Sequence, residues 1–249
     1  MMVQAGQGRI LARRFAPRSS VANSIRERHE MMAELTEKEV RKLTEGFHGP
    51  QALGPLTWLV GEWEGNGGVD VSFHNKDNET GETGYFEKFR FYPIPKQENG
   101  QQELEGLKYE NTAWRHGEEA MNPFHDEIGY MLWDKQRGQV KRVVVFGRGI
   151  AILAGGDAKP RDKKIKFTAR PGDLNYGILQ NKYLSERAEL RHFESTFALN
   201  DDGTFSYEQT LVLKLAALDG KEMDHTDKNT LHLVKRFHPS SELAAIREI

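Results

Sequence analysis

The feature that most restricts the fold is a change of periodicity at Trp58. From Trp58 to Phe237, short runs rich in aromatic and β-branched residues alternate with clusters of Gly, Asn and Asp. This pattern is typical of an antiparallel meander, in which consecutive strands are joined by tight turns. No long helical pattern separates the runs, which excludes a parallel α/β sheet. A meander of about ten strands removes its exposed edges by closing into a barrel.

We therefore predict an all-β fold, a closed antiparallel up-and-down barrel like those of lipocalins and fatty-acid-binding proteins. The predicted strands cover residues 61–67, 85–92, 103–115, 125–134, 139–146, 150–154, 164–169, 187–199, 204–218 and 230–237. Residues 66–84 are predicted to form a long polar loop, and residues 155–163 and 170–186 further loops. A barrel of this size has room inside for one small ligand.

The segments on either side of the barrel differ in composition. Residues 1–30 contain six arginines and no acidic residue before Glu27, which predicts a basic, disordered tail. The alternatives are an organelle transit peptide and a true start at Met31 or Met32. Residues 31–50 are predicted to form a helix with a capping-box start and a Gly-then-Pro stop. The barrel is expected over residues 51–238 and a C-terminal tail over 239–249.

Composition excludes several classes of protein. The net charge of −2 shows no electrostatic footprint for nucleic acid. The chain has no cysteine, which rules out disulfides, thiolate zinc sites, iron–sulfur clusters and cysteine nucleophiles. No apolar run approaches the ~18 residues of a membrane helix. These observations predict a soluble, cytoplasmic protein without a nucleic-acid or membrane partner, with organelle import through residues 1–30 as the alternative.

Four sequence motifs resemble one known family. Residues 55–67 read Pro-Leu-Thr-Trp-Leu-Val-Gly-Glu-Trp-Glu-Gly-Asn-Gly, and residues 123–130 read Pro-Phe-His-Asp-Glu-Ile-Gly-Tyr. A glycine-flanked pair at 140–146 and 149–155, and His225 followed by Asn229-Thr230-Leu231, are looser matches. Over residues 53–237 the chain resembles the nitrobindin family, the haem-binding barrels related to fatty-acid-binding proteins and found as the C-terminal domain of a THAP-type protein. It departs from the family between Gly67 and Tyr85, a stretch that is longer and more polar here.

The resemblance implies a ten-stranded barrel that binds haem b through one histidine near the C-terminus, here His225. A neutral imidazole suffices as the ligand, and its second nitrogen needs a partner, for which Asp224, Asp227 or a backbone carbonyl are candidates. His232, in the middle of the last predicted strand, is the rival metal ligand. The alternative is that His225 is a turn residue that satisfies local backbone groups.

Further cofactor-binding residues are predicted between residues 63 and 152. Gly65 and Gly67 let a planar ligand approach the backbone. His125 and Glu127 share one face of a strand, either to bind polar ligand edges or to form a buried structural network. The pocket walls are predicted to come from Trp63, Phe89, Phe146 and Ile152. No catalytic side chain is predicted.

The resulting hypothesis is a barrel that binds haem b, with nitric oxide or peroxynitrite reacting at ferric iron, and so an activity like that of a peroxynitrite isomerase. One alternative is a metal-free binding protein for a fatty acid or another lipid, with Arg90 or Arg142 holding a carboxylate. Another is a barrel packed shut that acts through its surface. A homodimer is among the expected assemblies.

Overall fold

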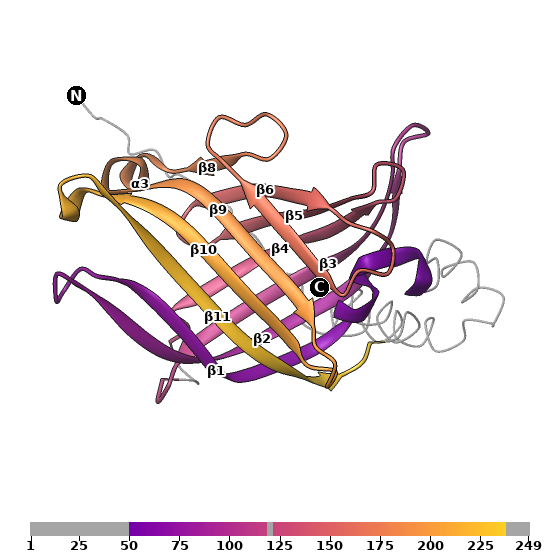
Figure 1. Cartoon of the computed structure of the whole chain (residues 1–249), viewed down its shortest axis with the longest axis horizontal. Coiled ribbons are helices and arrows are strands. Elements are labelled where there is room, and N and C mark those ends of the chain that lie inside the picture. The colour runs from indigo at the N-terminus through magenta and orange to yellow at the C-terminus, as the bar shows by residue number, and fades with distance from the viewer. Residues whose placement is uncertain (1–49, 119–121, 238–249) are drawn as a thin grey trace, which may run out of the picture. The chain divides into compact units, whose positions relative to one another are not determined.

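The computed structural model describes residues 50–118 and 122–237 (Figure 1). The predicted tails at 1–30 and 239–249 lie outside the described residues, as does the helix predicted at 31–50 apart from Pro50. Three short helical segments are described: η1 (Pro50–Leu59), α3 (Lys182–Arg187) and η2 (Ala216–Leu218). None of the described helices has the length and apolar character needed to cross a membrane.

The described residues form an antiparallel barrel. Its strands are β1 (Gly61–His74), β2 (Glu79–Glu98), β3 (Glu103–Arg115), β4 (His125–Asp134), β5 (Gln139–Phe146), β6 (Ile150–Asp157), β7 (Lys164–Ala169), β8 (Ile178–Gln180), β9 (Ala188–Leu199), β10 (Phe205–Leu215) and β11 (Lys221–Lys235). Ten of them form a ring in the order β5-β4-β3-β2-β1-β11-β10-β9-β7-β6, and β6 pairs back with β5. β8 pairs with β6 outside the ring. The predicted closed, all-β barrel of about ten strands is confirmed.

Several predicted boundaries are correct and others are wrong. The predictions for β3, β4, β5 and β7 agree with the structure. Residues 66–84, predicted as a polar loop, instead extend β1 and β2 into a long hairpin whose turn lies at 75–78. β11 begins at Lys221 rather than at residue 230, and the predicted loop at 170–186 contains β8 and part of α3. Polar side chains do not stop a strand while the backbone groups stay paired with a neighbour.

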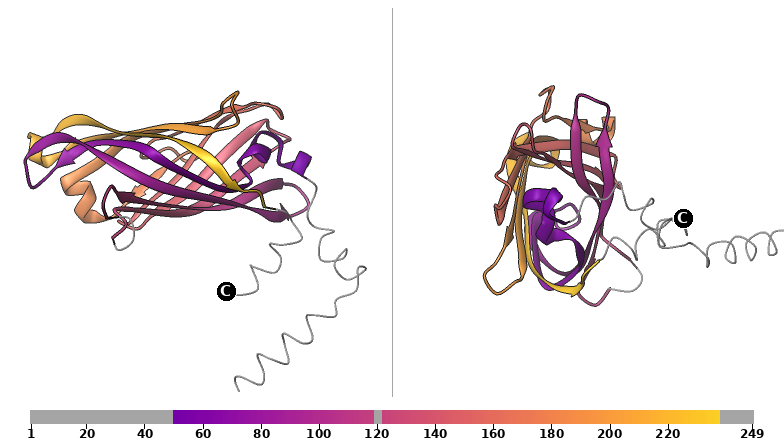
Figure 2. Two further views of the ribbon diagram at one scale, coloured as in Figure 1. Left: turned by 90° about the horizontal axis from the view of Figure 1, so that it is seen from below. Right: turned by 90° about the vertical axis from the view of Figure 1, so that its right-hand side faces the viewer.

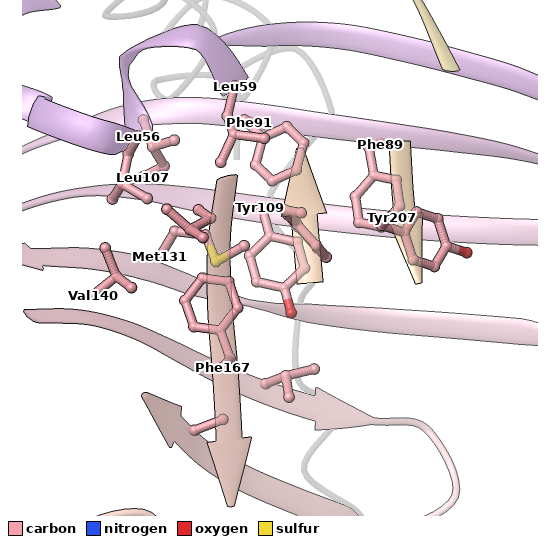
Figure 3. Packing of buried hydrophobic residues seen from close by; sticks show 14 of the residues in the cluster. Leu56, Leu59, Phe89, Phe91, Leu107, Tyr109, Met131, Val140, Phe167 and Tyr207 are labelled. Atoms are coloured by element: carbon pink, nitrogen blue, oxygen red, sulfur yellow. The ribbon is translucent and has the colours of Figure 1, made fainter. Parts of the chain in front are cut away.

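One end of the barrel is closed by η1 and by an aromatic core. The η1 residues Leu53, Leu56 and Leu59 are buried in this core. The indole nitrogen of Trp63 donates a hydrogen bond to the carbonyl of Leu59 at 2.7 Å, and its ring lies edge-on to Phe205. Figure 3 shows Leu56 and Leu59 of η1 beside the cluster of rings. Dense packing of aromatic side chains fills the barrel interior at this end.

The opposite end carries α3 and the tip of the β1–β2 hairpin (Figure 2). Inward-facing side chains near η1 are buried, whereas those near the opposite end are only half-buried. Ser72 of β1, Leu213 of β10 and Met223 of β11 are half-buried in this way. Alternation along each strand places these three side chains on the same face as the buried core residues. The interior is therefore reached from this end, which we call the open end.

Candidate functional site in the barrel interior

The two histidines of β11 face opposite sides of the barrel wall. Asn229 and Leu231 are buried, and His225 shares their inward-facing alternation, whereas His232 is exposed. His225 also lies inside a strand, because it pairs with Leu211 of β10, and the turn predicted as its alternative setting is absent. Of the two predicted ligands, only His225 reaches the interior.

Asp70 of β1 is the partner of His225. Its Oδ2 lies 2.5 Å from Nε2 of the ring, and Ser72 donates a hydrogen bond to Oδ1 at 2.6 Å. Burial disfavours both charges, but the hydrogen bond and the opposite charges outweigh it, so the pKa of Asp70 is lowered and that of His225 is raised. The sequence pointed instead to Asp224, which is exposed, or Asp227.

This pairing leaves one nitrogen of His225 unused. Among the described residues, no group forms a hydrogen bond with Nδ1. The side chain of His225 is 28% exposed, so the ring is accessible from the open end. A neutral imidazole whose one nitrogen is held by a carboxylate offers the lone pair of the other nitrogen to a metal.

Two further acid or base groups lie close to this pair in the barrel. Asp227 sits opposite Asp70 across the β1–β11 ladder, and Gln209 donates a hydrogen bond to its Oδ2 at 3.3 Å. Burial raises the pKa of Asp227. His125 of β4 lies 3.4 Å from Oε2 of Glu127. Burial lowers the pKa of His125, but Glu127 outweighs this effect and the net pKa is raised.

A buried arginine forms a polar layer between the site and the core. Nη2 of Arg142 donates to Oε1 of Glu127 at 2.6 Å, and both side chains are almost fully buried. The same guanidinium donates to Tyr109, Ser195 and Gln209. Burial disfavours the charge of Glu127, yet the charge of Arg142 and the neighbouring His125 lower its pKa below the ordinary value. Both residues are candidates from the sequence, but their pairing was not predicted.

A second buried acid, Glu87 of β2, was not predicted from the sequence. Its carboxylate accepts hydrogen bonds from Asn111 at 2.9 Å, Asn229 at 2.8 Å and Tyr207 at 3.1 Å. Tyr207 in turn lies 2.7 Å from the hydroxyl of Tyr85. Burial raises the pKa of Glu87 to about 7, although the two amides act against it. The alternation of Tyr85, Glu87 and Phe89 along one strand places the glutamate inside, a signal that the sequence does contain.

The predicted wall residues fall into two groups. His125 and Phe146 lie together, with ring centroids 5.6 Å apart, and Ile152 lies on β6 opposite Ile178 of β8. Trp63, Phe146 and Ile152 all belong to the buried hydrophobic cluster, and Trp63 lies at its closed end beside η1. These positions place His125, Phe146 and Ile152 on the same half of the barrel as His225.

The remaining three predicted residues are part of the wall and the core. Phe89 is stacked on Phe91 in the closed half. Gly65 faces inward, but the space beside it is filled by Asn229 and Leu231. Gly67 is exposed in the β1 bulge, where the register with β2 shifts between Gly65 and Gly68. The contacts of these three are with other parts of the wall and core.

The residues of the open half fit a haem group. One inward histidine has a carboxylate on one nitrogen, which is the donor set of a singly ligated haem iron. Leu211 pairs directly with His225, and Phe146 and Ile152 supply further apolar surface.

The fold and this interior define the class of ligand-binding β-barrels. Residues 52–232 match the model of the family described as "THAP4-like, heme-binding beta-barrel domain", and the chain belongs to this family, whose cofactor is haem. A peroxynitrite isomerase of Clavibacter sepedonicus is 32% identical over 111 residues, which are 45% of this chain and 47% of that protein. The match thus spans about half the length of this curated relative. The crystal structure of Rv2717c from M. tuberculosis shares the fold, with a TM-score of 0.50, 19% identity, and coverage of 75% of this chain and 98% of that one.

Proposed function

We propose that this barrel binds haem b in its open half with His225 as the iron ligand, and that it converts peroxynitrite to nitrate. The observation that carries the proposal is the inward position of His225, held at Nε2 by Asp70. Ferric haem held there would supply an iron centre that can react with nitric oxide or peroxynitrite. The peroxynitrite isomerase among the relatives supports this choice of reaction.

The chain's own residues have separate tasks in this proposal. His225 provides the lone pair, and Asp70 fixes the orientation and tautomer of the ring. Phe146 and Ile152 exclude water from one side of the ligand. In this proposal the ligand lies in the open half, beyond the aromatic core that is packed at the closed end.

A haem titration of the full chain, followed by absorbance, tests the proposal. We expect a saturable one-to-one Soret shift in the parent protein, its loss in His225→Ala and its persistence in His232→Ala. His232 is the matched control because it lies on the same strand but faces outward. If the parent gives no saturable shift, or if His225→Ala retains it, the proposal is wrong.

A second candidate function follows from the inward position of Arg142. An arginine inside a barrel is a partner for a ligand carboxylate, as in a lipid-binding protein. Arg90, the other predicted candidate, does not serve, because it faces outward and pairs with Glu62 at 2.9 Å. Glu127 already occupies the guanidinium of Arg142, so a fatty acid would have to displace an internal carboxylate. Displacement of a fluorescent fatty acid, without any haem shift, would favour this candidate.

A further inference from the structure

The end of β3 that lies furthest from η1 carries an arginine that faces the barrel interior. Tyr109 and Ala113 of β3 are buried, and Arg115 continues their inward alternation. Arg115 pairs with the buried Tyr85 of β2, in a part of the β2–β3 ladder without a register shift. Residues that lie directly opposite each other on antiparallel strands point to the same face. Arg115 is therefore an inward-facing cation at the rim of the open half.

Aromatic rings hold the guanidinium of Arg115 at this rim. The guanidinium lies over the ring of Phe124, 4.9 Å from its centroid. Phe124 in turn packs edge-on against Tyr85, with ring centroids 5.6 Å apart. The face of an aromatic ring attracts a cation, and a stacked guanidinium keeps the N–H groups of its edge for hydrogen bonds. The rings thus orient Arg115 without using its donors.

The ion pair that Arg115 makes within the chain can be exchanged for a ligand. Nη1 of Arg115 lies 3.4 Å from Oε2 of Glu118, and the two side chains are 45% and 47% exposed. Exposed ion pairs of this kind contribute little free energy. Arg142 differs, because Glu127 binds its guanidinium at 2.6 Å and both side chains are almost fully buried. A carboxylate that enters the open half can therefore bind Arg115, whereas Arg142 is already occupied.

The charges of the open half also direct a carboxylate toward Arg115. Asp70 and Asp227 lie opposite each other on β1 and β11, beside His225. Arg115 lies on β3, which β2 separates from β1 in the ring of strands. A ligand carboxylate is repelled by the two acids and attracted by the guanidinium. The polar end of an anionic ligand is thus favoured on the β3 side of the rim.

We propose that Arg115 binds a propionate carboxylate of the haem at the rim of the open half. This inference rests on the proposed function, because it takes His225 as the iron ligand. Haem b is an apolar ring with two propionate groups on one edge, so a pocket for it needs an apolar interior and a cation at the mouth. The fork of an arginine matches a carboxylate through two parallel hydrogen bonds.

Titrations of the full chain with haem and with haem dimethyl ester, each followed by Soret absorbance, test this inference. The ester keeps the iron and the ring but has no carboxylate charge. The parent should bind haem more tightly than the ester. Arg115→Gln should weaken haem binding and reduce this preference by about tenfold, as expected for the loss of a partly exposed hydrogen bond to a charged group.

Arg90→Gln is the matched control. Arg90 lies on the neighbouring strand β2 and is 42% exposed, but it faces outward, where it pairs with Glu62. This substitution should leave the affinities for haem and for the ester unchanged. The circular dichroism spectrum and thermal midpoint of Arg115→Gln should match those of the parent, because Arg115 is exposed at the end of its strand.

Two results would overturn the role of Arg115 alone. One is an equal affinity of the parent and Arg115→Gln for haem, and the other is an equal loss of affinity for haem and for the ester. In both cases a Soret shift that is lost in His225→Ala leaves the proposed function intact. A parent without a saturable Soret shift overturns the proposed function and this inference together.

Discussion

Asp70 has two separate effects on the imidazole of His225. It holds Nε2 and so fixes the direction in which the remaining nitrogen points, and its charge stabilises the proton on the ring. A serine hydroxyl on Oδ1 restricts the carboxylate in turn. The ring is thus positioned before any ligand arrives, which reduces the entropy that haem binding would cost.

We predict that Asp70→Ala weakens haem binding by about tenfold or more, the usual loss when the partner of a metal-binding histidine is removed. The measurement is the dissociation constant from the absorbance titration. Asp224→Ala is the control, since Asp224 is also an acid next to His225 but faces outward. Tighter binding in Asp70→Ala would mean that the carboxylate competes with iron for the ring.

Arg142 and Glu127 give a prediction about stability. Both are almost fully buried, so Glu127→Gln leaves the guanidinium without its counter-charge in a poorly solvated place. We expect a loss of about 3–5 kcal/mol in the free energy of unfolding, measured with denaturant. Asp201→Asn, which breaks the exposed pair with Lys163, should cost less than about 1 kcal/mol. Equal losses in the two variants would contradict this account.

The candidate site was only partly predictable from the sequence. His225 was predicted through its family motif, and only the bounds of β11 in the structure show that it shares the inward alternation, whereas His232 does not. Asp70 was missed because residues 66–84 were assigned to a loop. Pairing of an acid with a histidine 155 positions away depends on the register of β1 with β11, which no local pattern encodes.

At the scale of the element, the β1–β2 hairpin shows why polar composition misled the strand prediction. Val69, Val71 and Phe73 alternate with Asp70 and two other polar residues, which is a strand pattern of period two. The polar members face the interior near the open end, and the apolar members face outward, the reverse of the usual arrangement. In β3 and β7, whose apolar side chains face inward, both boundaries were predicted correctly.

The bulge of β1 provides a prediction for a single element. A methyl group at Gly68 would collide with the ring of Tyr85, whereas the nearest atom to one at Gly67 is Oδ1 of Asn229 at 3.8 Å. We expect Gly68→Ala to lower the free energy of unfolding by about 1–3 kcal/mol, the range found for overpacked sites. Gly67→Ala is the matched control, with little change. Equal effects of the two substitutions would show that backbone freedom, and not the space beside Tyr85, matters here.

At the scale of the whole molecule, the barrel is divided along its length into a packed half, a polar layer and an open half. η1 and the aromatic core form the first, and Arg142, Glu127 and Glu87 belong to the second. Buried polar groups weaken a fold unless each one is paired. Oε2 of Glu127 has no hydrogen-bond partner among the described residues and lies 3.4 Å from Nε2 of His125. Burial of the charges in this layer therefore costs the fold stability.

This cost should appear in the pH dependence of stability. The pKa of Glu87 is raised from 4.5 to about 7 by burial, so the folded state holds its proton more tightly than the unfolded state does. The contribution of this proton to the free energy of unfolding is fully present below pH 4.5 and is lost as the pH rises through about 7. The loss is on the order of 3 kcal/mol, from the size of the pKa change.

Glu87→Gln isolates this contribution, because glutamine stays neutral at every pH. We predict that the free energy of unfolding of the variant, relative to the parent, rises by about 3 kcal/mol between pH 4.5 and pH 8. Asp70 and Glu127, whose pKa values are lowered, give the opposite trend, but they titrate in both proteins and cancel in the difference. A flat difference for Glu87→Gln would mean that Asn111, Asn229 and Tyr207 stabilise the buried carboxylate as well as water does, and that the polar layer costs the fold nothing at neutral pH.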